Sequence, residues 1–387
     1  MPEINPNLDL VDALVPLAAT SPVSAVRHQR DKVVAATQGS YDAIFDAALP
    51  GLSMGERLLA AHRVACLSGS AALQAHYRDR LLAGDRPNEV QLAALNGEPV
   101  PGDGRLQTIL AFTRTLTERP VDGDRAALLT LPAAGLDTAE VVVLAQLIGF
   151  VAYQVRVLAG LQAMAAAPVG EAAAPLAPAS DAAPFVHPAH LPKPGEPVRV
   201  NGYTSESLEW RAWLPVLDLA QATPAQLAVL ESSHPKARTS DYYRLLAHQP
   251  RILNERSLVF NAIMYAPGGL SRSERELASA AVSRINGCVY CAAVHAQRFE
   301  QLAKRNDVIH QLFSDPMSAG TSPRERAVVQ LAVTLTREPA RFAAADLAGV
   351  RAAGLSALEM LDLVHAVAIF AWANRLMLNL GEPVFLG

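Results

Sequence analysis

Hydrophobic and polar positions along the chain predict helices, and no segment shows the alternation of a strand or hairpin. The clearest helix start is Ser322, because Pro323 can occupy the first helical position and an acidic residue follows in the first turn. This helix should stop near Pro339. A further helix is expected over 342–353, with Gly354 as its C-cap.

Two segments are almost purely apolar, 141–153 and 363–373. Both are shorter than the roughly 18–20 residues that a membrane span needs, and charged residues flank them. We therefore predict two buried core helices, the second capped by Ser356 and continuing through Leu380. The first residues lack the basic and apolar regions of a signal peptide, so a cytoplasmic protein without a membrane partner is expected.

The chain repeats itself at a shift of 218 or 219 residues. The sequence Leu-Thr-Glu-Arg-Pro at 116–120 recurs as Leu-Thr-Arg-Glu-Pro at 335–339, and Ala-Ala-Gly-Leu at 133–136 recurs at 352–355. Single positions follow the same shift: Glu56 and Glu274, His76 and His295, Glu140 and Glu359, Tyr153 and Trp372, Arg156 and Arg375. Agreement at so many positions indicates two copies of one helical module.

An Ala- and Pro-rich segment separates the copies. Eight prolines between 165 and 197 forbid a continuous helix and favour an extended tether. The predicted division is a first domain over 1–164, a linker over 165–197 and a second domain over 198–387.

Composition supports this picture and narrows the function. Alanine and leucine are abundant and aromatics make up 5%, so the predicted fold class is all-α, with two tandem helical modules. A net charge of −4 with no basic block argues against a nucleic-acid partner. Three cysteines in 387 residues exclude a disulfide scaffold and suit a reducing cytosol.

The candidate chemistry lies in the second copy. Cys288, Cys291 and His295 share one face of a helix, which the helix-breaking pair Asn286-Gly287 should place in a new first turn. Free backbone N–H groups and the helix dipole at that position favour a thiolate. His295 can transfer a proton, and Glu276 can fold back to orient it.

Three interpretations of this motif remain open. The two cysteines can be small buried hydrophobic residues, or Cys288, Cys291, His295 and Glu276 can form a zinc site. A redox dithiol is favoured, because two of the three cysteines of a cysteine-poor chain occupy the motif.

The spacing of Glu276, Cys288-x-x-Cys291 and His295 resembles the alkylhydroperoxidase D signature, within the carboxymuconolactone decarboxylase-like superfamily. The resemblance covers most of 210–387. Within the superfamily, the sequence is similar to the peroxidase-related branch. It implies a helical fold that forms homo-oligomers and a thiol peroxidase that needs no metal or other cofactor. It also implies that Cys291 attacks the hydroperoxide, that Cys288 resolves it, and that His295 and Glu276 relay the proton.

The sequence departs from that signature at Tyr290, where the archetypal enzymes have a second histidine. Tyr290 can donate a hydrogen bond but cannot act as a base at neutral pH. The first copy departs further: aligned through His76, its cysteine positions hold Gly69 and Ala72, and Cys66 stands alone. We therefore expect the first copy to be catalytically silent and to stand in for a second subunit.

The function predicted from sequence is reduction of hydroperoxides by a dithiol that an external dithiol reductant reopens. Two alternatives are a decarboxylase or lactone-processing enzyme and a non-enzymatic thiol redox sensor. In the last helix, Arg375 is expected to pair with Glu359 or Asp362, and His365 to be a core histidine.

Overall fold

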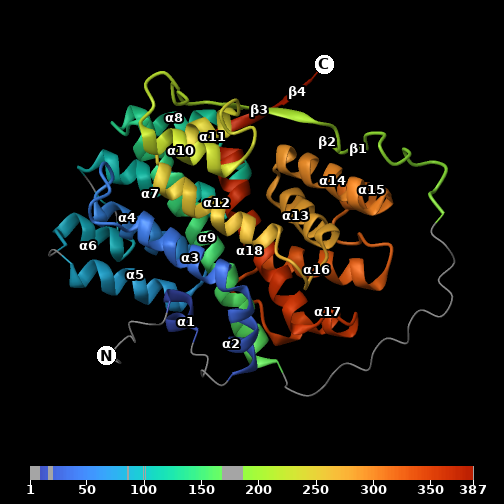
Figure 1. Ribbon diagram of the computed structural model, residues 1–387. Helices are drawn as coiled ribbons and strands as arrows, with labels where there is room; N and C mark the ends of the chain where they lie inside the picture. Colours follow the sequence, from blue (N-terminus) through green and yellow to red (C-terminus); the bar gives the residue numbers. More distant parts are fainter. Residues whose placement is uncertain are drawn as a thin grey trace.

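The computed structural model describes residues 9–15, 21–84, 87–98, 100, 102–167 and 186–386. Within these ranges the chain is helical apart from two short antiparallel strand pairs, which confirms the all-α prediction (Figure 1). The predicted linker lies partly outside the described residues, which stop at 167 and resume at 186.

The elements of the first half are α1 (Leu10–Leu14), α2 (Pro22–Arg27), η1 (His28–Arg30), α3 (Asp31–Ile44), α4 (Met54–Leu67), α5 (Ala71–Ala83), α6 (Glu89–Leu95), α7 (Gly104–Glu118), η2 (Pro120–Asp122), α8 (Arg125–Ala133) and α9 (Thr138–Ala166). Most of the longer helices begin at a capping residue, and Ser53 forms a full capping box with Glu56 at the start of α4.

The second half opens with strands β1 (Arg199–Val200), β2 (Tyr203–Thr204) and β3 (Leu208–Ala212). Its helices are α10 (Pro224–Ser233), α11 (Asp241–Leu246), α12 (Pro250–Met264), α13 (Arg272–Asn286), α14 (Val289–Ala303), α15 (Asp307–Ser314), α16 (Pro323–Arg337), η3 (Ala344–Leu347), α17 (Ala348–Ala352) and α18 (Ala357–Asn379). Strand β4 (Gly381–Phe385) closes the chain against β3, and β1 pairs with β2.

The predicted helix boundaries hold closely in the C-terminal part. Ser322 caps α16 with Pro323 at its first position, and Ser356 caps α18 through a capping box. The helix expected over 342–353 is instead a 3-10 turn followed by the short α17. Gly354 follows it with φ +78°, the left-handed conformation that glycine adopts without a Cβ clash.

The structure repeats at the shift found in the sequence. Helices α4 and α13 begin 218 residues apart, as do α5 and α14, whereas α7 and α16, and α9 and α18, begin 219 apart. One ion-pair network recurs in both halves. Arg105 of α7 bridges Glu56 and Glu140 at 2.8 and 2.6 Å, while its counterpart Arg324 bridges Glu274 and Glu359, both at 2.5 Å. Each network ties the starts of three helices together.

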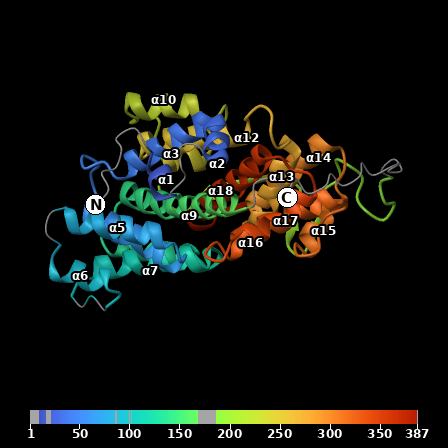
Figure 2. The same ribbon diagram turned by 90° about the horizontal axis from the view of Figure 1, so that it is seen from below.

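Equivalent helices from the two halves also pack on each other. Helix α9 lies along α18 in the centre of the molecule, and α3 lies against α12 on one side (Figures 1 and 2). This pairing is the arrangement of a symmetric dimer, with both partners supplied by one chain.

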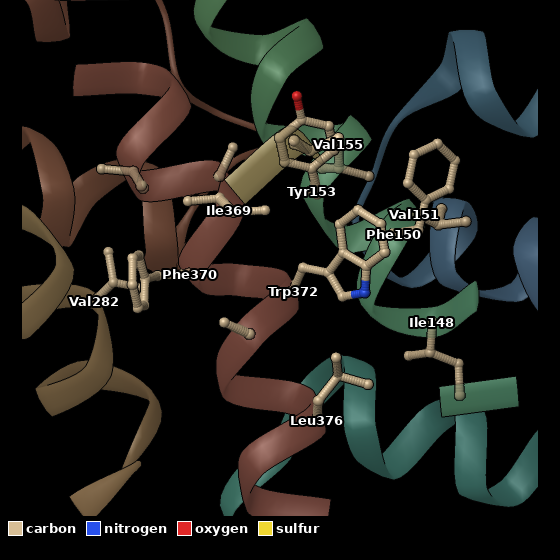
Figure 3. Close-up of a cluster of buried hydrophobic side chains, with 14 of the residues drawn as sticks. Ile148, Phe150, Val151, Tyr153, Val155, Val282, Ile369, Phe370, Trp372 and Leu376 are labelled. Atoms are coloured by element: carbon tan, nitrogen blue, oxygen red, sulfur yellow. The ribbon is translucent and has the colours of Figure 1, made fainter. Parts of the chain in front are cut away.

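The α9–α18 contact is the middle of the core. Trp372 lies edge-on to Phe150, with ring centroids 5.3 Å apart, and its indole N–H donates to Gln146 at 2.9 Å (Figure 3). Gly149 permits this approach, because a Cβ there would lie 2.3 Å from the Trp372 ring. Both helices are long and apolar enough to cross a membrane, yet 100% and 89% of their most apolar windows are buried inside the structure. They are core helices, as predicted.

Candidate active site

The site is built where α13 ends and α14 begins. The backbone turns at Gly287, whose φ of +82° places it in the left-handed region. Cys288 then caps α14, and its Sγ accepts the Cys291 backbone N–H at 3.4 Å. The Asn286-Gly287 break therefore sets both thiols in a new first turn, as predicted from the sequence.

The two thiols are reduced and deeply placed. Cys288 is 1% exposed and Cys291 is 4% exposed. Burial raises the pKa of Cys288 well above its ordinary value, and the neighbouring Cys291 raises it further. At neutral pH the Cys288 thiol is therefore protonated.

His295 follows one turn after Cys291 on the same face of α14, and its Nδ1 lies 2.5 Å from Oε2 of Glu276 on α13. The other carboxylate oxygen of Glu276 accepts from Arg272, also at 2.5 Å. Glu276 is fully buried. Burial alone would raise its pKa, but His295 and Arg272 together outweigh that effect and lower it. The carboxylate therefore stays ionised and holds His295 in one orientation.

Aromatic rings surround this group. Phe370 of α18 lies edge-on to the His295 ring, with centroids 4.3 Å apart. Tyr290 packs partly buried beside the cysteines, and burial, reinforced by the negative charge that Cys291 can carry, raises its pKa to about 12. Tyr290 thus remains a phenol at neutral pH and cannot serve as a base.

The structure places all the residues singled out by sequence on the packed pair α13 and α14. Cys288, Tyr290 and Cys291 lie at the junction of the two helices, and Glu276 of α13 contacts His295 of α14. Sequence reasoning missed Arg272, although its position four residues before Glu276 is the spacing of a helical ion pair. It also missed Phe370, which no sequence signal connects to His295. Among the described residues, no three His, Cys, Asp or Glu side chains converge as metal ligands would.

The first copy needs a different alignment from the one expected. Gly69 has φ +67° and Ser70 is the N-cap residue of α5, so they correspond to Gly287 and Cys288 at a shift of 218. The counterpart of Cys291 is therefore Leu73 rather than Ala72, and Tyr77 rather than His76 replaces His295. The expectation based on His76 was one residue out of register; the absence of the cysteine pair stands.

Residues 250–334, from α12 to most of α16, match the model of the carboxymuconolactone decarboxylase family. This segment is similar to that family. It contains the site residues from Arg272 to His295, but not Phe370, and we call it the family segment. The chain is also similar to a solved structure described as an alkylhydroperoxidase AhpD core, an uncharacterized peroxidase-related protein from Ralstonia eutropha JMP134. The identity is 25%, with 44% of this chain and 88% of that chain covered and a TM-score of 0.38. No curated protein matches the chain.

Proposed function

We propose that the protein is a thiol peroxidase that reduces hydroperoxides through Cys291 and Cys288. The observation that carries this proposal is the first turn of α14. Two thiols lie there within one helical turn, on the same face as a histidine whose other side is held by a buried carboxylate. The family segment and its peroxidase-related structural relative are consistent with this chemistry.

The reaction begins with proton transfer. His295, oriented by the Glu276 carboxylate, takes the proton of the Cys291 thiol, and the first-turn N–H groups stabilise the thiolate. The thiolate sulfur attacks the O–O bond, forming Cys291 sulfenic acid and an alkoxide that takes up the proton to leave as an alcohol. The hydroperoxide gains two electrons and Cys291 loses two.

Resolution uses the second thiol. Cys288 attacks the Cys291 sulfenic sulfur, the S–S bond forms and water leaves. An external dithiol then reopens the disulfide by exchange and is itself oxidised. Since burial raises the pKa of Cys288, its attack should be the step that accelerates as pH rises above neutral.

The test is a count of thiols on the full chain before and after one equivalent of cumene hydroperoxide. Trypsin cleaves after Arg284 and Arg298, so both active cysteines fall on one peptide, 285–298, while Cys66 lies on another. We expect the 285–298 peptide to lose two hydrogen atoms and to regain them with dithiothreitol. The Cys66 peptide should remain unchanged.

Three variants assign the roles. Cys291→Ser should lower peroxidase turnover by at least ~10³-fold, because the nucleophile is absent. Cys288→Ser should accumulate a sulfenic acid that dimedone traps, and the matched control Cys66→Ser should behave as wild type. Undiminished turnover in Cys291→Ser overturns the assignment. Turnover that survives alkylation of both thiols favours the decarboxylase or lactone alternative, and a reversible disulfide without turnover favours the sensor.

A further inference from the structure

A cavity between the two halves is lined by neither Cys288 nor Cys291. It has a volume of about 660 Å³, within the range of small-molecule sites. Its walls come in equivalent pairs: the segment 117–121 at the end of α7 and the segment 336–340 at the end of α16 both line it, as do 67–69 and 285–286. Arg156 of α9 and Arg375 of α18, which occupy equivalent positions in the repeat, both line it.

The two arginines form equivalent hydrogen bonds, each to a backbone carbonyl of the other half. Arg156 donates to the carbonyl of Thr336 in the other half at 2.7 Å, and Arg375 donates to the carbonyl of Thr117 at 3.0 Å. Each also donates to its own helix, to Ala152 and Ala371 respectively.

The prediction that Arg375 pairs with Glu359 or Asp362 is therefore wrong. Glu359 pairs with Arg324, while Asp362 pairs with Arg30 and Arg275.

Both guanidinium groups lack a counter-charge. Arg156 is 4% exposed and Arg375 is 2% exposed, and neither forms an ion pair within the described ranges. In each, the Nε atom has no hydrogen-bond acceptor among the described residues. The carbonyl ends of α7 and α16 supply partial negative charge, but two full positive charges remain close together. Burial lowers the pKa of both, that of Arg156 to about 10, and Arg156 lowers that of Arg375 further.

The rim is charge-balanced and supplies an apolar surface. Arg119, Arg337 and Arg341 face the acids Glu118 and Glu338, and Asp122 pairs with Arg119, so the uncompensated positive charge comes from the two buried arginines. Pro120, Val121, Pro339 and Ala340 add apolar walls. Such a combination suits a molecule with an anionic head and an apolar body.

We propose that this cavity binds a small organic anion, whose phosphate or carboxylate group neutralises Arg156 and Arg375 while its body lies against the apolar rim. Two guanidinium groups that line the cavity without a carboxylate partner match the several acceptor oxygens of such a head group. The site is separate from the thiols, since neither Cys288 nor Cys291 lines it. Anion binding therefore does not depend on the peroxidase proposal.

The experiment measures binding to the reduced full chain by calorimetry and by thermal shift at constant ionic strength. The probes are phenyl phosphate and benzoate, which carry head and body, and inorganic phosphate, which is the head alone. We expect saturable binding and a rise in Tm, with phenyl phosphate tighter than inorganic phosphate. The comparison of phenyl phosphate with benzoate identifies the preferred head group.

Arg156→Met/Arg375→Met keeps the apolar stems but removes both charges, and should weaken binding by at least about tenfold for each arginine. Arg114→Met/Arg298→Met removes two exposed charges outside the cavity lining and should bind as wild type. Equal binding by the two double variants overturns the proposal, as does a wild-type protein that binds none of the probes.

A second variant covers the case in which the buried double variant fails to fold. Ala340→Trp at the exposed rim should fill the cavity while leaving both arginines in the chain, and so abolish the binding. Alkylation of Cys66 gives an independent readout of ligand binding, because Cys66 also lines the cavity. In a Cys288→Ser/Cys291→Ser background, phenyl phosphate should slow alkylation of Cys66. Unchanged binding in Ala340→Trp would overturn the proposal.

Discussion

The two helix junctions, α4–α5 in the first half and α13–α14 in the second, share a backbone but differ in chemistry. Gly69 and Gly287 both adopt positive φ, and the helix that follows begins in each case two residues later. Where the second half has Glu276 and His295, the first has Leu58 and Tyr77. Tyr77 donates instead to Gln154 at 2.5 Å.

This difference shows that the scaffold and the site depend on different residues. The turn glycine, the capping serines of α4 and α13 and the Arg105 and Arg324 networks are retained in both halves, so the helices pack alike. The first half fills its junction with the fully buried Leu73 and Tyr77 rather than with titratable groups. One junction is packed as core, and the other leaves a thiol pair beside an acid–base pair.

Converting the second junction toward the first should have the largest effect. Glu276→Leu/His295→Tyr should lower peroxidase turnover by about 10²–10⁴-fold, because general acid–base help is lost while both thiols remain. The milder Glu276→Gln should lose less, since an amide still accepts the His295 hydrogen bond. Steady-state turnover with cumene hydroperoxide measures both. Glu300→Gln, which changes a buried glutamate of α14, is the control, and a drop there equal to that in Glu276→Gln would contradict the assigned role.

His365 and its counterpart Gln146 differ in their response to acid. Burial lowers the pKa of His365 to about 4, with Asp362 opposing and Arg27, Arg30 and Arg275 adding to the shift. Between pH 6.5 and 4 the His365 imidazole takes up a proton in the unfolded state but stays neutral in the folded state. The free energy of unfolding therefore falls as the pH drops from 6.5 to 4.

Replacing His365 with the residue of the first copy, His365→Gln, should recover about 3 kcal/mol of that loss at pH 4 relative to pH 7. Urea unfolding at the two pH values measures the effect, and the exposed His190→Gln serves as the control. An identical pH slope in wild type and His365→Gln would contradict the expectation.

Installing thiols in the first junction sharpens the comparison of backbones. In a chain without its three native cysteines, Ser70→Cys/Leu73→Cys should form an internal disulfide on oxidation, because the two positions match Cys288 and Cys291. The loss of the buried Leu73 should cost about 2 kcal/mol. No peroxidase turnover is expected, since the Glu–His pair is missing.

Mass spectrometry after oxidation detects the new disulfide. The matched control is Ser70→Cys/Ala72→Cys, in which the two side chains are two residues apart and face different directions. Faster disulfide formation in this control would show that Leu73 is not the counterpart of Cys291.

Glycine replacements give the smallest effect. Gly287→Ala and Gly69→Ala should each cost about 1–2 kcal/mol, from the left-handed backbone and from contacts of the new methyl with Val121 and Ala340 respectively. Only Gly287→Ala should also change the rate at which a thiol reagent modifies Cys288. Gly354→Ala, with positive φ but open space around it, isolates the backbone cost. Unaltered thiol reactivity in Gly287→Ala would contradict the role given to this turn.

Local sequence signals were sufficient for the fold class, the main helix boundaries and the composition of the candidate site. Ser322, Ser356 and Gly354 act within a few residues of their own positions, so their roles can be read without the rest of the chain. The short spacing from Cys288 to His295 likewise fixes a shared helix face. The predicted alignment of the first junction was wrong by one residue, because matching residues occur at shifts of both 218 and 219. Only the backbone conformation of Gly69 distinguishes the two shifts.

Residue patterns are enough to show that the chain is helical, that it repeats, and that one repeat carries a thiol pair with a histidine and a carboxylate. The partners of the buried charges follow only from the packing of the helices. Arg375 has carboxylates nearby in sequence, yet its guanidinium reaches Thr117, 258 residues away, and joins Arg156 at a cavity between the halves. The pairing of α9 with α18 sets that contact, and the packing of two distant helices has no local signature that a residue pattern can reveal.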